Sequence, residues 1–173
     1  MKQHLTPTAE QRLFPNFNQT PGEQAWYFVS DQVMGGVSHG EVHTYAEQGQ
    51  IQTCLQGQVS LENNGGFIQM QWVLDRGVDL SQFNGFYVDW RGQTPALALH
   101  LKTDQLMRPW QSYRYETQVS AQWQRQYIAF TDFAPYRTDA PLDLAHVRRL
   151  AVIALGEAGP VQVCVREMGL YRS

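Results

Sequence analysis

Hydrophobic and polar residues alternate along most of the chain, in short runs separated by Gly, Asn and Pro. Alternation places every second side chain on the same face of a strand, so each run predicts a β-strand. The runs lie at 26–29, 41–46, 50–55, 58–61, 67–74, 85–91, 96–103, 113–119, 123–130, 147–155 and 161–168. Many short strands without regularly alternating helices are typical of an all-β protein, an antiparallel β-sandwich or jelly roll.

The alternation also predicts which face of a strand enters the core. In the run 96–103 the three leucines share the inward face, whereas His100 and Lys102 lie on the outward face. The runs 113–119 and 123–130 are joined by a short polar turn, so we expect them to form a hairpin.

Length and the start of the chain set the domain organisation. With 173 residues, 43% of them hydrophobic, the chain can bury a core without disulfides or metals. Residues 1–21 are polar, contain three prolines and show no helical period, which predicts an arm packed on the domain with Phe14 and Phe17 as anchors. Residues 22–173 are predicted to form a single domain, with one short helix at 139–148.

Charge and targeting signals narrow the function classes. A net charge of −3 with no basic stripe argues against nucleic-acid binding. No continuous apolar run of about 20 residues is present, so no membrane span is expected. The first residues carry neither a signal-peptide nor a transit-peptide pattern, which predicts a cytoplasmic protein. Cys54 and Cys164 are then expected to be free and buried more readily than joined in a disulfide, although the pattern leaves their redox state open.

The segment 30–40 gathers an acid, hydroxyls, a histidine and three glycines into one short connector. Gly35 and Gly36 can adopt positive φ and fold the backbone tightly, which brings the two ends of the connector together. Such a connector is either a rigid corner between strands or a binding site. In the second case the ligand contacts would be Asp31, Ser38 and His39.

A second polar turn precedes the run 67–74. Its residues are Asn63, Asn64, Gly65 and Gly66, a sequence typical of a tight turn. The turn lacks the acidic density of a calcium loop, and no histidine pair has the spacing of zinc ligands, so neither a metal nor a cofactor is expected. Ser38 has no strand-Gly-x-Ser-x-Gly-helix context, which argues against a hydrolase, and no catalytic residues are predicted.

Charged and aromatic side chains are also predicted on the outward face of the middle strands. Ligand contacts expected there are Arg91, His100, Trp110 and Tyr113, in company with Tyr87, Asp89, Lys102, Arg114 and Glu116. Aromatic faces stack on sugar rings or on partner side chains, and Arg can fix orientation through paired hydrogen bonds. The same residues could instead form a solvated sheet face whose opposite charges pair across strands.

Several motifs occur together in a fixed order from residue 24 to 172. They are Trp26, Asp31-x-x-Met34-Gly35-Gly36-x-Ser38, Asn63-Asn64-Gly65-Gly66-Phe67, Asp79-Leu80-Ser81-x-Phe83-x-Gly85, Phe133-Ala134-Pro135 and Gly159-Pro160. In this order and spacing the chain resembles the complex I intermediate-associated protein 30 family. The resemblance implies a galactose-binding-like β-sandwich, a jelly roll also used by carbohydrate-binding modules. It further implies a role in binding or assembly without established catalytic residues.

Two functions follow from these expectations. The first is a non-catalytic, assembly-factor-like domain that binds a protein partner through the loops around Asp31–Ser38 and the adjacent sheet face. The alternative is a carbohydrate-binding module that holds a glycan on a concave sheet face with Arg91, Trp110 and Tyr113.

Overall fold

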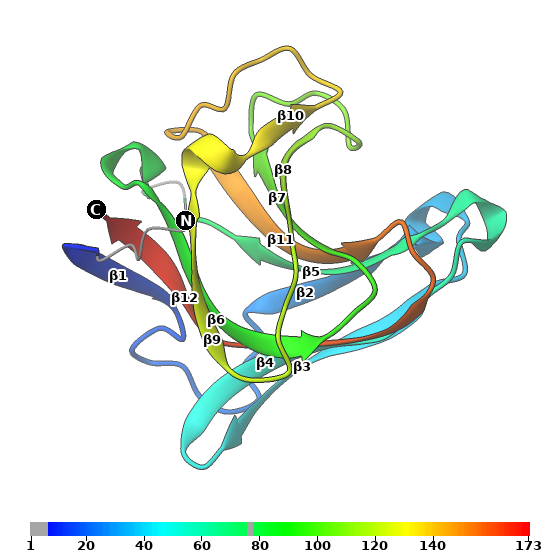
Figure 1. Cartoon of the computed structure of the whole chain (residues 1–173), viewed down its shortest axis with the longest axis horizontal. Helices are drawn as coiled ribbons and strands as arrows, with labels where there is room; N and C mark the ends of the chain where they lie inside the picture. Colours follow the sequence, from blue (N-terminus) through cyan, green and yellow to red (C-terminus); the bar gives the residue numbers. More distant parts are fainter. Residues whose placement is uncertain (1–6, 76–77) are drawn as a thin grey trace.

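The computed structural model describes residues 7–75 and 78–173, which form two packed β-sheets (Figure 1). Sheet A has the strand order β3 (His39–Glu47), β4 (Gln50–Val59), β12 (Gly159–Arg172), β6 (Gly85–Gln93), β9 (Gln124–Ala129), and β1 (Ala9–Phe14) also pairs with β12. Sheet B has the order β10 (Ala134–Tyr136), β8 (Ser112–Thr117), β7 (Leu97–Thr103), β11 (Val147–Leu155), β5 (Phe67–Val73), β2 (Trp26–Ser30). Every strand pairing is antiparallel.

The core lies between the two sheets and is built from alternate positions of their strands. In β7, Leu99 and Leu101 are completely buried among the core residues, as are Ile68 and Met70 of β5. From sheet A, the alternating valines of β12 fill the opposite wall. The inward faces predicted from the alternation are therefore confirmed, and so is the antiparallel β-sandwich.

One predicted connection is different in the structure. The hairpin predicted from 113–119 and 123–130 is wrong, because β8 pairs in sheet B with β7 and β10 whereas β9 pairs in sheet A with β6. The chain crosses from one sheet to the other between these strands (Figure 1). Alternation shows that a segment is a strand, but it carries no information on which strand lies beside it.

The N-terminal segment contributes a strand. Residues 9–14 pair with the C-terminal end of β12, residues 168–172, and the Phe14 side chain is completely buried. Phe14 packs edge-on against Trp26, with 6.0 Å between ring centroids. Phe17 is 94% exposed and does not anchor the segment in the core.

The helix predicted at 139–148 is also wrong. The Asp143 carboxylate accepts a hydrogen bond from the Ala145 amide (3.1 Å), and the His146 amide donates to the Asp143 carbonyl oxygen (3.0 Å). These bonds close a tight turn, after which β11 begins at once at Val147. The helical segments are single 3₁₀ turns at Asp31–Met34, Glu62–Asn64, Leu80–Gln82 and Phe130–Asp132. Within the described residues, none is a helix long and apolar enough to span a membrane.

Cys54 and Cys164 are joined by a disulfide, contrary to the expectation of free thiols. They lie directly opposite each other on β4 and β12, with their Cα atoms 4.0 Å apart. The register of the two strands therefore brings together two cysteines that are 110 residues apart in sequence.

Candidate functional site

The turn after β2 is organised around one buried carboxylate. Asp31 is completely buried, and its Oδ1 accepts a hydrogen bond from the Ser38 amide (3.0 Å). Its Oδ2 accepts from the Ser38 hydroxyl (2.5 Å), from the Gly66 amide (2.6 Å) and from the Phe67 amide (3.3 Å). Asp31 thus ties the turn after β2 to the turn before β5. We call residues 30–38 and 61–67 together the turn unit.

The glycines of the turn unit make room for this carboxylate. A Cβ atom on Gly36 or on Gly65 would overlap the Asp31 side chain, so a larger residue at either position would displace it. Asn63 and Asn64 adopt left-handed backbone conformations with φ of 57° and 58°, and Asn63 donates from its side-chain Nδ2 to the Gly35 carbonyl oxygen (3.3 Å). The two turns predicted separately from the sequence therefore form one structure.

The hydrogen bonds also decide the ionisation of Asp31. Burial by itself raises the pKa of this carboxyl, but the hydrogen bonds from Ser38, Gly66 and Phe67 outweigh it and lower the pKa below its usual value. Asp31 and Ser38, both predicted as ligand contacts, have no exposed surface, and they are hydrogen-bonded to each other within the turn unit. His39, the third predicted contact, is exposed at the start of β3.

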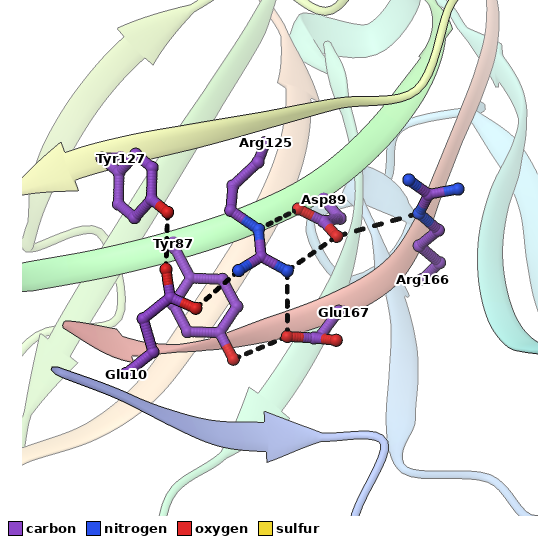
Figure 2. A network of polar contacts seen from close by, with 7 residues as sticks. All are labelled: Glu10, Tyr87, Asp89, Arg125, Tyr127, Arg166 and Glu167. Atoms are coloured by element: carbon purple, nitrogen blue, oxygen red, sulfur yellow. Dashed lines mark hydrogen bonds and ion pairs between the residues drawn. The ribbon is translucent and has the colours of Figure 1, made fainter. Parts of the chain in front are cut away.

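The outer face of sheet A carries a closed network of opposite charges (Figure 2). Arg125 of β9 donates from Nε to Asp89 Oδ1 (2.6 Å) and from Nη2 to Asp89 Oδ2 (3.0 Å), which is a bidentate pair. It also donates to Glu10 Oε2 (2.6 Å) and to Glu167 Oε2 (3.1 Å). Strands β1, β6, β9 and β12 are thereby joined through one guanidinium group.

Aromatic groups complete this network. Tyr127 donates to Glu10 (2.5 Å) and Tyr87 to Glu167 (2.8 Å), while the Arg125 guanidinium lies 4.4 Å from the centroid of the Tyr87 ring. Burial and the hydrogen bond to Glu167 raise the pKa of Tyr87 well above its usual value, so its hydroxyl stays protonated. These polar groups are paired with one another, which is the arrangement of a structural cluster.

Arg91, another predicted ligand contact, lies on the same outer face. Its guanidinium and that of Arg166 each lie 4.7 Å from the Trp123 ring centroid, and Arg91 Nη2 is 3.9 Å from Glu47 Oε2. A groove of about 650 Å³ opens at one end of this face, lined by His39 together with glutamines of β4, β6 and β12.

The outer face of sheet B has a different charge arrangement. His100 of β7 lies directly opposite Arg114 of β8 and opposite Ala151 of β11, and the next outward residue of β7, Lys102, lies directly opposite Arg149. We call Lys102, Arg114 and Arg149 the cation cluster. Within the described parts of the chain, no carboxylate oxygen lies within 4.0 Å of their charged nitrogens.

The contacts that the cation cluster does make are uncharged. Lys102 Nζ donates to the Pro109 carbonyl oxygen (2.5 Å), and Arg114 donates from Nε to Ser112 Oγ (2.9 Å). Burial and the neighbouring Arg149 and Arg114 lower the pKa of Lys102. Like charges across adjacent strands are unfavourable without an anion between them.

His100 is enclosed by these cations. Only 6% of its surface is exposed, and its Nε2 atom is buried without a hydrogen-bond partner among the described residues. Burial, and then the charges of Arg114 and Lys102, lower the pKa of His100 to about 3, so the imidazole is neutral at physiological pH. The Nε2 atom of the neutral imidazole is therefore surrounded by positive charge and has no hydrogen-bond partner among the described residues.

A groove of about 650 Å³ adjoins the cation cluster. Lys102 and Arg149 line it together with the apolar side chains of Val73, Leu106 and Met107. Val73 is 52% exposed and Met107 90% exposed, so the groove offers apolar surface next to positive charge.

The residues predicted to share one sheet face are separated by the fold. Arg91 lies on β6 of sheet A and His100 on β7 of sheet B, so the two side chains point away from opposite sides of the sandwich. Tyr113 is 1% exposed, faces the core and donates to the Ala140 carbonyl oxygen (2.9 Å). Trp110 is 52% exposed in the connection between β7 and β8. The predicted grouping of Arg91, Trp110 and Tyr113 does not form.

Two important residues were not singled out from the sequence. Arg149 precedes the inward Leu150, so alternation places it outward, but only the register of β11 against β7 puts it opposite Lys102. Arg125 likewise lies on an outward position of β9, and its three acidic partners come from three other strands. In the described ranges there is no group of three or more His, Cys, Asp or Glu residues arranged to hold a metal ion.

Comparison with known proteins gives one family and several solved structures. The model of the family described as complex I intermediate-associated protein 30 matches residues 15–165. No curated protein is significantly similar to the chain in sequence.

The similar solved structures include carbohydrate-binding modules of Clostridium thermocellum. A family 11 module of the cellulosomal cellulase Lic26A-Cel5E has a TM-score of 0.71 and 13% identity, with 96% of each chain covered. A family 11 module in complex with a β-1,3-1,4-mixed-linked tetrasaccharide has a TM-score of 0.70 and 15% identity, covering 94% of this chain and 96% of that one. The family 30 module of the cellulase Cel9D-Cel44B has a TM-score of 0.66 and 17% identity, covering 95% and 98%. At these identities the likeness establishes the galactose-binding-like fold alone.

Proposed function

Since the chain belongs to the complex I intermediate-associated protein 30 family, we propose that it is a non-catalytic binding domain that engages a protein partner, as an assembly factor does. The proposal is supported by the hydrogen bonds that the polar side chains of the turn unit make within it. The Asp31 carboxylate and the Ser38 hydroxyl are used up in holding backbone amides, which leaves them unavailable as a general base or a nucleophile.

One observation carries the proposal, the apolar surface of the turn unit. Val33 is 75% exposed, Met34 65%, Leu61 50% and Val37 40%, although the turn beneath them is rigidly hydrogen-bonded. Apolar side chains gathered on an exposed, fixed loop mark a protein contact surface more than a sugar site, because a sugar needs polar groups for its hydroxyls. A rigid loop also loses little conformational entropy on binding.

Photo-crosslinking in the native cells tests this proposal. A photoreactive phenylalanine analogue at Met34 should capture a discrete protein partner, whereas the same analogue at Gln56 on the outer face of sheet A should not. The double variant V33S/M34S should lose the partner while keeping its unfolding midpoint, since both side chains are exposed. Equal crosslinking from both positions, or unchanged partner binding by V33S/M34S, would refute the proposal.

A carbohydrate-binding role is the second candidate, favoured by the similarity to carbohydrate-binding modules and by exposed aromatic residues. Tyr27 is 54% exposed on the outer face of sheet B, and Trp110 is 52% exposed in the β7–β8 connection. Exposed aromatic rings can stack on sugars. Calorimetric titration with a β-1,3-1,4-mixed-linked tetrasaccharide tests this role. Binding that is lost in Tyr27→Ala and retained in Tyr45→Ala, on sheet A, would favour it over the protein-binding role.

A further inference from the structure

We propose that the cation cluster of sheet B, with His100 at its centre, is a recognition site for an acidic peptide segment of a partner protein. The site lies outside the turn unit and differs from it in chemistry. It therefore goes beyond the proposed function, and it can be tested independently on the purified chain.

The first argument is the like-charge pairing. Lys102 and Arg149 lie directly opposite each other, and Arg114 lies opposite His100, two residues along β7 from Lys102. The Cβ atoms of residues directly opposite on neighbouring strands are about 5 Å apart, and like charges at such a pair are destabilising. On the outer face of sheet A the corresponding cations are neutralised by carboxylates, as Arg125 is by Asp89. An anion held between the sheet B cations would convert their repulsion into attraction.

The second argument is the state of His100. Only 6% of its surface is exposed, so the residue is more than nine-tenths buried. Its Nε2 atom has no hydrogen-bond partner among the residues that the structure describes. A neutral imidazole nitrogen can donate a hydrogen bond, and an oxygen anion drawn in by Arg114 and Lys102 is a suitable acceptor once these side chains move aside from the covered Nε2 atom. A buried polar atom without a partner costs stability, so a ligand that supplies one gains affinity.

The third argument decides the class of ligand. The adjoining groove presents the aliphatic and thioether side chains of Val73, Leu106 and Met107 beside Lys102 and Arg149. An acidic peptide can place carboxylates on the cations and an apolar side chain in this groove. An acidic polysaccharide has no apolar side chain to fill it. The Tyr136 ring is already covered by the Arg114 guanidinium, 3.4 Å from the ring centroid, so it is not a free platform for a sugar ring.

Nearby carboxylates do not cancel the cluster. Glu116 lies two residues along β8 from Arg114, and Asp75 lies in the groove, but neither is within ion-pair distance of the three cations. Asp104, also in the groove, is paired with His146 (2.8 Å) and with Arg148 (3.4 Å). The cluster therefore keeps its positive charge.

Fluorescence anisotropy with defined probes tests the site. The probes are a short fluorescein-labelled peptide rich in glutamate with a central leucine, its glutamine counterpart, and a sulfated oligosaccharide. The double variant K102Q/R149Q removes two charges from the cluster. The matched control R12Q/R172Q removes two exposed charges, one from β1 and one from the end of β12. The two double variants therefore have the same net charge.

The glutamate peptide is expected to bind the unmodified chain and R12Q/R172Q alike, and to bind K102Q/R149Q at least about tenfold more weakly, since charge-assisted hydrogen bonds are lost. The glutamine peptide should bind each of the three chains at least about tenfold more weakly than the glutamate peptide binds the unmodified chain. In NMR spectra the ring resonances of His100 should shift on addition of the glutamate peptide, while those of His43, exposed on sheet A, should not.

Three outcomes would overturn the site. They are no binding of the glutamate peptide, an equal loss in both double variants, and binding of the sulfated oligosaccharide alone. The second would mean that only net charge matters, and the third would assign the cluster to an acidic glycan. Urea unfolding of K102Q/R149Q guards against a folding defect, and its midpoint should not fall because the substitutions relieve repulsion. A failure here leaves the crosslinking result at Met34 unaffected.

Discussion

The outer faces of the two sheets show how the same kinds of residue can serve stability or remain available for binding. On sheet A, Arg125 meets three carboxylates from three other strands (Figure 2). The disulfide Cys54–Cys164 lies on the same face. On sheet B, Lys102 and Arg149 of the cluster lie opposite each other, and the Nε2 atom of His100 has no hydrogen-bond partner among the described residues. A face whose charges are satisfied within the chain has little to offer a ligand. A face whose charges are unsatisfied destabilises the fold, and a ligand that pairs with these charges removes the destabilisation.

The largest expected effect concerns the covalent link on sheet A. The double variant C54S/C164S should lower the free energy of unfolding by about 4–5 kcal/mol, because the bond closes a long loop in the unfolded chain. Urea unfolding measures the loss. Dithiothreitol should lower the midpoint of the unmodified chain and leave the variant unchanged, and insensitivity of the unmodified chain would contradict the prediction.

The second effect separates the two faces directly. Arg125→Gln leaves Asp89, 7% exposed, without its bidentate partner and should lower the free energy of unfolding by about 2–3 kcal/mol. The matched change on sheet B, Arg114→Gln, should cost less than about 1 kcal/mol, because it removes a cation that has no acidic partner in the described ranges and loses mainly the stacking on Tyr136. Similar losses in both variants would remove the distinction between the faces.

The third effect is a pH dependence that belongs to sheet B. His100 has a pKa of about 3 in the folded chain, against an ordinary value near 6.5, so the unfolded chain binds the proton more readily between these values. Stability is therefore retained above about pH 6.5 and falls as the pH is lowered, by about 1.5 kcal/mol between pH 6.5 and pH 5. In His100→Gln this part of the pH dependence should disappear in urea titrations. A variant with the same pH profile as the unmodified chain would show that other groups cause it.

The smallest effect has the opposite sign. Arg149→Glu places a carboxylate directly opposite Lys102 and replaces repulsion with attraction. The free energy of unfolding should rise by about 0.5 kcal/mol, while binding of the glutamate peptide should fall. Measuring the free energy of unfolding and the affinity for the glutamate peptide on one preparation tests whether the cations that allow binding also lower the stability. A lower stability of Arg149→Glu would contradict the like-charge argument.

Part of this molecule can be predicted from its sequence. Alternation identifies most of the strands and their inward faces, since side chains of a strand point alternately to its two sides whatever lies beside it. The ordered motifs identify the family, and the glycines and asparagines identify the two turns, because only residues that accept positive φ or leave space for a carboxylate fit there. The short strands β1 and β10 are too brief or too polar to show alternation.

The tertiary structure alone decides which strands are neighbours, and with that the site. Whether 113–119 and 123–130 form a hairpin or enter different sheets depends on the packing of the whole sandwich, which no local pattern encodes. The same packing separates Arg91 from His100, places Arg149 opposite Lys102 and joins Cys54 to Cys164. The sequence determines which residues point outward. Their partners, and therefore whether a charge is neutralised or left for a ligand, depend on strand order and register.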